Sequence, residues 1–216
     1  MSDAFAFLPS WSHLLPFLAA ALALNLTPGA DMTYVISRSV AQGRSAGLAS
    51  AFGIFTGAVV HTVLAAAGVS ALLAASEVGF QVLKWAGAGY LVWLAIKLFR
   101  AKVSADELAA PRHAAIWRVW AEGVLVNLLN PKVAIFILAF LPQFTEPARG
   151  AVWAQILVLG MLFDVGGTAV NCAVAMLAGG FAQRLRARPR IVVWMNRTSG
   201  TVLGLLAARL ACSHRS

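Results

Sequence analysis

Charged side chains are scarce in this chain. Only 12% of its 216 residues are Asp, Glu, Lys or Arg and 60% are hydrophobic, whereas a typical soluble domain is about 25% charged. This composition excludes an ordinary soluble protein and indicates a membrane protein, provided that the apolar residues gather in runs of about 20. Cysteine is also rare, and the positions of Cys172 and Cys212 exclude a disulfide framework or a cysteine-rich metal site.

Two kinds of catalytic motif are missing as well. The sequence has no His-Glu-x-x-His pair and no motif of paired carboxylates. An enzyme embedded in the membrane would also gather its polar residues at one interface, whereas here they recur in both halves of the chain. We therefore expect a protein that is not an enzyme and needs no cofactor, with a membrane-embedded enzyme as an alternative.

The hydrophobic residues collect into six long runs, each of about the length that crosses a bilayer. The runs are residues 14–36, 48–74, 79–99, 120–141, 152–178 and 191–211. They predict an all-helical integral membrane protein with six transmembrane helices and a single domain, residues 1–216. No Lys or Arg precedes the first run, which we expect to be a retained helix rather than a secretory signal.

The basic residues predict how the chain threads the membrane. Twelve of the seventeen Lys and Arg residues follow the first, third and fifth runs, whereas only Lys84, Arg149, Arg209 and Arg215 belong to the other side. Positive loops stay in the cytoplasm, so both termini should face outward from the cell inner membrane. The net charge of +9 then reflects contact with anionic lipid, and no nucleic-acid partner is expected.

The six runs divide into two halves of three, and an odd number of spans makes the halves inverted. The first half covers about residues 1–100, a cytoplasmic connector about 101–117, and the second half about 118–216. Matching interruptions in two inverted halves indicate the binding site of a transporter. Whether two copies form a homodimer stays open, because no surface in the sequence indicates one.

Both the first and the fourth run carry such an interruption, rich in polar residues and proline. They read Asn25-Leu26-Thr27-Pro28-Gly29 and Asn127-Leu128-Leu129-Asn130-Pro131. Proline costs a helix interior about 3 kcal/mol, and unwound backbone in a bilayer must be buried in protein or line a cavity. The two helices should therefore be kinked or broken, with Pro28, Gly29 and Pro131 facing inward and Asn25, Thr27, Asn127 and Asn130 binding either the freed backbone or a zwitterionic solute.

Acidic residues within the spans are further candidates. Asp31 and Lys132 follow the two prolines and could share one polar interior, and Asp164 lies halfway along the fifth run, where a proton carrier would be placed. Glu122 is better explained as a carboxylate at the membrane surface. His61 is either part of a proton relay or a buried histidine bonded to a carbonyl.

Three segments together resemble the lysine-exporter (LysE/RhtB) family. They are residues 25–31, residues 37–47, and residues 127–144 with their Asn-Leu-Leu-Asn-Pro-Lys and Phe-Leu-Pro-Gln-Phe motifs. The resemblance implies a secondary exporter that moves amino acids or their derivatives, such as threonine, homoserine, homoserine lactone or basic amino acids, out of the cell by proton antiport. An exporter of divalent metal ions is an alternative, for which Asp31, Asp164 and His61 would be the candidate ligands.

Overall fold

A computed structural model describes residues 7–75, 77–100 and 113–187, together with residues 193, 194, 196–198, 200, 201, 204, 205, 207 and 208. Most of the predicted connector and about half of the predicted sixth span lie outside these residues. The described chain is helical and contains no strand. Its first helices are α1 (Trp11–Leu26), α2 (Ala30–Gln42), α3 (Arg44–Ala75) and α4 (Glu77–Arg100).

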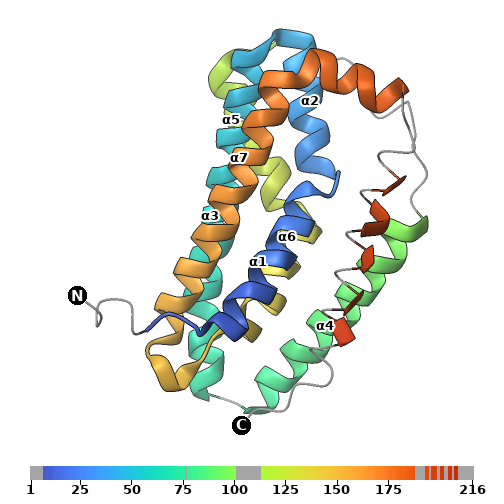
Figure 1. The fold of residues 1–216 in the computed structure, drawn as a ribbon. Coiled ribbons are helices and arrows are strands. Elements are labelled where there is room, and N and C mark those ends of the chain that lie inside the picture. Colours follow the sequence, from blue (N-terminus) through green and yellow to red (C-terminus); the bar gives the residue numbers. More distant parts are fainter. Residues whose placement is uncertain are drawn as a thin grey trace.

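The later helices begin after the connector. They are α5 (Ile116–Leu128), α6 (Pro131–Ile135), the π-helical turn η3 (Phe136–Phe140), the 3-10 turns η4 (Leu141–Phe144) and η5 (Pro147–Arg149), and α7 (Val152–Ala187). The pair α1–α2 and the pair α5–α6 run in opposite directions through the molecule (Figure 1).

Both predicted helix breaks are confirmed. The axis bends by 43° between α1 and α2 and by 52° between α5 and the segment Pro131–Phe144. Within the described residues, two helices are long and apolar enough to cross a membrane: Arg44–Gly68 and Val152–Ala178. The number of candidate spans rises to four if each bent pair of helices counts as one span. The helix α4 covers the predicted third run but is not among these segments.

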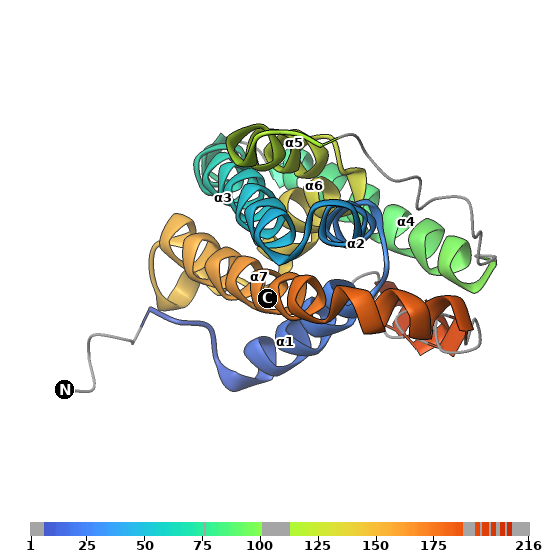
Figure 2. The same cartoon turned by 90° about the horizontal axis from the view of Figure 1, so that it is seen from above.

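The long helix α3 is the scaffold of the molecule, with α5 and α7 packed along it (Figures 1 and 2). Glycines allow the helix backbones to approach closely. A Cβ atom at Gly53 of α3 would lie only 2.1 Å from the carbonyl oxygen of Trp120, and one at Gly123 would lie 2.8 Å from that of Ser50. Near the other end, Gly160 of α7 packs directly over Thr62.

An aromatic cluster fills the space that three elements enclose: α1, α7 and the segment Pro131–Phe144 that follows the second break. Phe136 stacks between Phe17, at a centroid distance of 6.3 Å, and Phe163, at 4.7 Å. Phe140 and Phe144 extend the cluster toward the end of the segment. The helix α4 lies to one side of this bundle (Figure 1). Described residues near the C-terminus pack on α4, as the contact of Gly200 with Ala95 and Phe99 shows.

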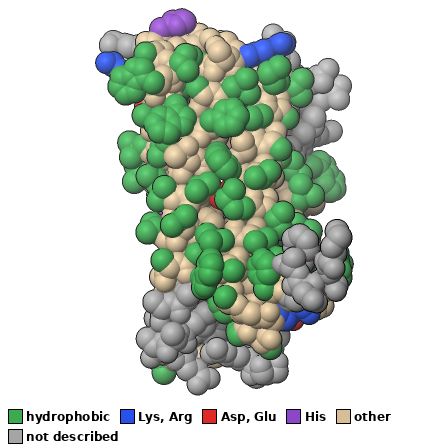
Figure 3. Space-filling view, turned by 90° about the vertical axis from the view of Figure 1, so that its left-hand side faces the viewer, with side chains coloured by type: hydrophobic (Ala, Val, Ile, Leu, Met, Phe, Trp, Pro, Cys, Tyr) green, Lys and Arg blue, Asp and Glu red, His purple; other side chains and the backbone are tan. Residues whose placement is uncertain are grey.

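The outer surface is apolar over the middle of the molecule. On the face that Figure 3 presents, hydrophobic side chains cover the central part and Lys and Arg side chains appear only toward the two ends. Exposed large side chains of this kind include Phe52, Leu64, Trp117, Leu125 and Leu162. In water such a surface would favour aggregation, whereas it suits contact with the acyl chains of a bilayer.

A polar cluster ties α2 to the start of α5. Arg38, whose side chain is buried, forms an ion pair with Glu122. The one hydroxyl proton of Tyr34 is shared between Glu122 and the Val119 carbonyl, each of which lies 2.9 Å from the hydroxyl oxygen. The Gln42 amide donates to the Ala114 carbonyl at 2.8 Å. The Glu122 side chain is half exposed, as expected of a carboxylate at the membrane surface. Its ion-pair partner, Arg38, was not predicted from the sequence.

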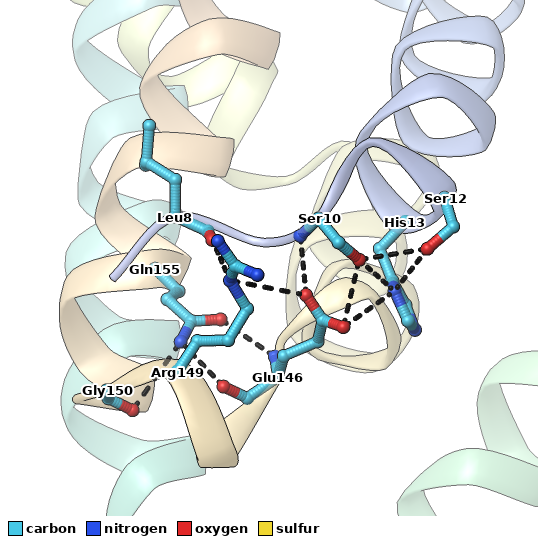
Figure 4. A network of polar contacts seen from close by, with 8 residues as sticks. All are labelled: Leu8, Ser10, Ser12, His13, Glu146, Arg149, Gly150 and Gln155. Atoms are coloured by element: carbon cyan, nitrogen blue, oxygen red, sulfur yellow. Dashed lines mark hydrogen bonds and ion pairs between the residues drawn. The ribbon is translucent and has the colours of Figure 1, made fainter. Parts of the chain in front are cut away.

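A second polar cluster, shown in Figure 4, holds the segment before α1 against the turn before α7. The Glu146 carboxylate accepts hydrogen bonds from the backbone and the hydroxyl of Ser10 and lies 3.2 Å from His13 Nδ1, while Gln155 binds the Glu146 backbone. Partial burial disfavours the charged form, but these hydrogen bonds and the nearby His13 and Arg149 outweigh it and lower the pKa of Glu146.

The close contact of α3 and α5 generates a stability prediction. Gly53→Ala should push the two helices apart and lower the free energy of unfolding by about 1–3 kcal/mol, the usual cost of overpacking. Gly68→Ala, in the same helix, is the matched control, because no atom from another part of the described structure lies within 4 Å of the place that its Cβ would occupy and alanine favours a helix over glycine by about 0.5–1 kcal/mol. Thermal unfolding in detergent measures both, and equal midpoints for the two variants would contradict the close packing.

Candidate functional site

The first helix break is built by Thr27, Pro28 and Gly29. The Thr27 hydroxyl and N–H both bond to the Ala23 carbonyl, at 2.6 and 3.1 Å, and close the last turn of α1. Pro28 cannot continue the hydrogen-bond ladder because it has no N–H. Gly29 is the N-cap of α2 and has no side chain, so the first N–H groups of α2 receive no hydrogen bond from a capping side chain.

The second break is built by Asn130 and Pro131. The Asn130 side chain accepts a hydrogen bond of 3.0 Å from the Lys132 N–H and so caps α6. Pro131 is the first residue of α6, where a missing N–H costs nothing. Its ring is exposed, so the prediction that Pro131 faces inward is wrong: the proline sets the break, and its neighbours Asn130 and Lys132 point into the protein. Pro28 is partly buried.

Each break is held by a side chain from the other. The Lys132 ammonium donates to the carbonyls of Leu24 and Thr27, both at 2.9 Å, which are freed at the end of α1. A cation at the C-terminus of a helix also favours the helix dipole. In the other direction, the two oxygens of Asp31 accept hydrogen bonds of 3.0 Å from the side-chain amides of Asn127 and Asn130.

Two small adjoining cavities, of about 30 Å³ each, lie at this crossing. They share six lining residues, including Asn25 and Asp31. Eight of the ten residues that the sequence indicated line one or both cavities: Asn25, Thr27, Gly29, Asp31, Asn127, Asn130, Lys132 and Asp164. Pro28 and Pro131 line neither.

Asp164 lies on the wall of the second cavity. The Thr62 hydroxyl of α3 donates to Asp164 Oδ2 at 2.9 Å, and the other carboxyl oxygen is buried without a hydrogen-bond partner among the described residues. No ion pair to this carboxyl is found in that part of the chain either. A buried, singly bonded carboxyl of this kind is a group that can take up a proton.

His61 is buried and lies with its Nε2 3.4 Å from the Asn127 carbonyl. This contact corresponds to the second of the two predicted alternatives, a buried histidine bonded to a carbonyl. In the described ranges, no three His, Cys, Asp or Glu side chains come together in a way that could hold a metal ion.

Residues 43–47 match the Gly-x-Ser-x-Gly spacing of serine hydrolases. In those enzymes the serine stands on a sharp turn from a strand to a helix and bonds to a histidine. Here the segment joins two helices, α2 and α3, and Ser45 is exposed with no hydrogen bond to a histidine among the described residues. The segment is a helix connection, whose turn uses the positive φ of 87° at Gly43.

Sequence reasoning missed several lining residues on α7 and α3. Phe163, Gly167 and Asn171 line both cavities, Thr168 lines the second, and Thr62 binds Asp164. One signal was available: Asp164, Thr168 and Asn171 recur at the spacing of one helix face within an otherwise apolar run. The side chain of Asn25 packs against Gly167, whose Cβ would lie 2.9 Å from Asn25 Oδ1, and donates to the Phe163 carbonyl at 3.1 Å.

Comparison with known proteins gives the context of this site. The family model described as LysE type translocator matches residues 22–214. The homoserine/homoserine lactone efflux protein of Salmonella typhimurium is 32% identical over 200 residues, which are 93% of this chain and 96% of that protein. The leucine efflux protein of Klebsiella pneumoniae is 30% identical over 205 residues, 92% of this chain and 94% of that protein.

A third relative, an uncharacterized membrane protein of Vibrio cholerae, is 32% identical over 197 residues, 90% of this chain and 95% of that protein. No solved structure matches the chain. The family model spans both helix breaks and both cavities, and the resemblance seen in the motifs is thereby confirmed. This chain is a membrane protein that belongs to the LysE type translocator family.

Proposed function

We propose that the protein exports a small amino acid or amino-acid derivative from the cytoplasm by proton antiport. One observation carries the proposal: an acid and a base from two different broken helices, Asp31 and Lys132, line the same cavity. A zwitterion presents an ammonium and a carboxylate a few ångströms apart, and this pair of charges complements both. The printed names of two relatives, which refer to efflux of homoserine or its lactone and of leucine, support the same class of substrate.

The substrate ammonium would bind beside Asp31. Each Asp31 oxygen accepts one hydrogen bond from an asparagine and has a second acceptor position left. The substrate carboxylate would bind at Lys132, which uses two of its three donors on carbonyls, and at the uncapped N–H groups of α2. A side chain on Gly29 would contact the Lys132 ammonium, at 3.5 Å from the Cβ position, so a glycine there keeps this part of the cavity open.

The same proposal includes six spans in two inverted halves, inserted in the inner membrane. The antiparallel course of α1–α2 and α5–α6 supports it (Figure 1). So does the end of the molecule where α2 meets the start of α5 through Arg38 and Gln42, since the basic residues Arg38, Arg44 and Arg118 lie in the helices that meet there. Movement of one half against the other around the fixed crossing would open the cavities to either side.

This topology can be tested with reporters. A reporter active only in the cytoplasm should give a signal when inserted in the connector, residues 101–117, and none when fused to the C-terminus. The positive-inside rule gives this expectation. A signal from the C-terminal fusion together with none from the connector would show the opposite orientation. The proposed direction of export would then be wrong.

A second experiment tests the substrate site. Asp31→Asn should abolish efflux while the protein still inserts, because the amide keeps the shape of the carboxylate but loses the charge that attracts the ammonium. Glu146→Gln makes the same chemical change outside both cavities and is the control. Efflux of labelled amino acids from preloaded cells measures both variants, and unchanged efflux by Asp31→Asn would refute the site.

Coupling to protons is assigned in this proposal to Asp164. A proton that moves inward across 100 mV supplies about 2.3 kcal/mol, and a carboxyl must release and rebind it during the cycle. Asp164→Asn should therefore leave slow exchange of amino acid that no longer responds to an uncoupler, whereas efflux by the unchanged protein should collapse when the uncoupler is added. Full proton-driven efflux by Asp164→Asn would make this acid structural and move the coupling to another group, such as His61.

A further inference from the structure

One polar side chain at the cavities, that of Asn171, has no hydrogen-bond partner among the residues that the structure describes. Asn171 lies on α7, is only 8% exposed, and lines both cavities. Its side-chain amide makes no hydrogen bond to any described residue. Its amide atoms are not among the fully buried polar atoms that lack a partner, so they keep accessible surface that a ligand in the cavities can reach.

The other buried or partly buried amides around the cavities differ from Asn171 in this respect. The side chain of Asn25 donates to the Phe163 carbonyl, that of Asn127 to Asp31, and that of Asn130 binds both Asp31 and the Lys132 backbone. These amides hold the protein together. Asn171 does not, which leaves both its donor and its acceptor available to a ligand.

The position of Asn171 relative to the charged residues decides which part of a ligand it can reach. It shares the first cavity with Asp31 and Lys132, which engage the charged groups of the substrate in the proposed function. It stands one helical turn beyond Gly167 on α7, about 6 Å along the axis. Gly167 on this wall is covered by the side chain of Asn25, while Phe163 and Val133 form the apolar part of the cavity lining.

The chemistry of an amide limits what it recognises. It carries no charge, but it can donate to a carbonyl, ring or hydroxyl oxygen and accept from a hydroxyl. A side chain without such a group would leave the Asn171 amide buried and unsatisfied, and this kind of mismatch discriminates strongly between ligands. A charged side chain would find no opposite charge in Asn171.

We infer that Asn171 is a specificity-determining residue that hydrogen-bonds an uncharged oxygen on the side chain of the exported molecule. The inference rests on the proposed function and narrows it: the protein transports amino acids whose side chain carries a hydroxyl in preference to purely aliphatic ones. Homoserine and leucine, the compounds in the names of the two relatives, are nearly matched probes that differ in this group.

The test compares the efflux of labelled homoserine and leucine from cells that express the full chain and are preloaded equally with both. The unchanged protein should export homoserine faster. Asn171→Leu, of similar size, should lower the ratio of homoserine to leucine efflux about tenfold, the factor that corresponds to about 1.4 kcal/mol. Asn171→Ser keeps a hydroxyl and should retain most of the ratio, and Val165→Leu, on the exposed side of α7, should not change it.

The ratio does not depend on how much protein reaches the membrane, so a poorly folding variant does not imitate the effect. Equal losses for both compounds in Asn171→Leu would show that Asn171 only packs, and a faster export of leucine by the unchanged protein would also overturn the inference. Both results leave the exporter function standing. If the unchanged protein exports no amino acid from a wider panel, the proposed function fails, and with it the inference.

Discussion

The need to satisfy backbone groups freed inside a bilayer organises this structure. No water is available in the hydrocarbon region, so a helix that stops there must find partners for its carbonyls within the protein. Here the partner is the ammonium of Lys132, which binds the carbonyls of Leu24 and Thr27. This contact requires the second break to lie beside the first, and the packing of α5 along α3, with glycines at the closest points, brings it there.

The same crossing explains why the candidate site is polar and yet well ordered. The Asp31 carboxylate is fixed by Asn127 and Asn130, and Lys132 is fixed by α1, so neither charge rests on direct contact with the other. Charges held in this way keep their positions when a cavity is empty, which suits a binding site that is largely formed in advance. The uncapped start of α2 adds N–H donors at the same place.

Much of this site could be predicted from the sequence because a proline with polar neighbours in an apolar run has few physical solutions. Asn25, Asp31, Asn127 and Lys132 were indicated on that ground alone. The outward orientation of Pro131 was not predicted, because a proline in the first turn of a helix needs no hydrogen-bond partner inside the protein. Asn171 was missed because the polar face that it shares with Asp164 and Thr168 does not by itself show whether it lines a cavity or packs on another helix. The partner of Glu122, Arg38, is 84 residues away in the chain.

The bond between Lys132 and the first break also bears on biosynthesis. Thr27 and Lys132 are 105 residues apart, and at typical rates of synthesis the ribosome takes roughly 5–20 s to make that length of chain. During this interval the end of α1 has been made but its carbonyls have no ammonium to bind. The first helix pair therefore cannot settle in its final state within the lipid when it emerges, and must wait in a wetter or protein-lined environment until the fourth predicted span arrives.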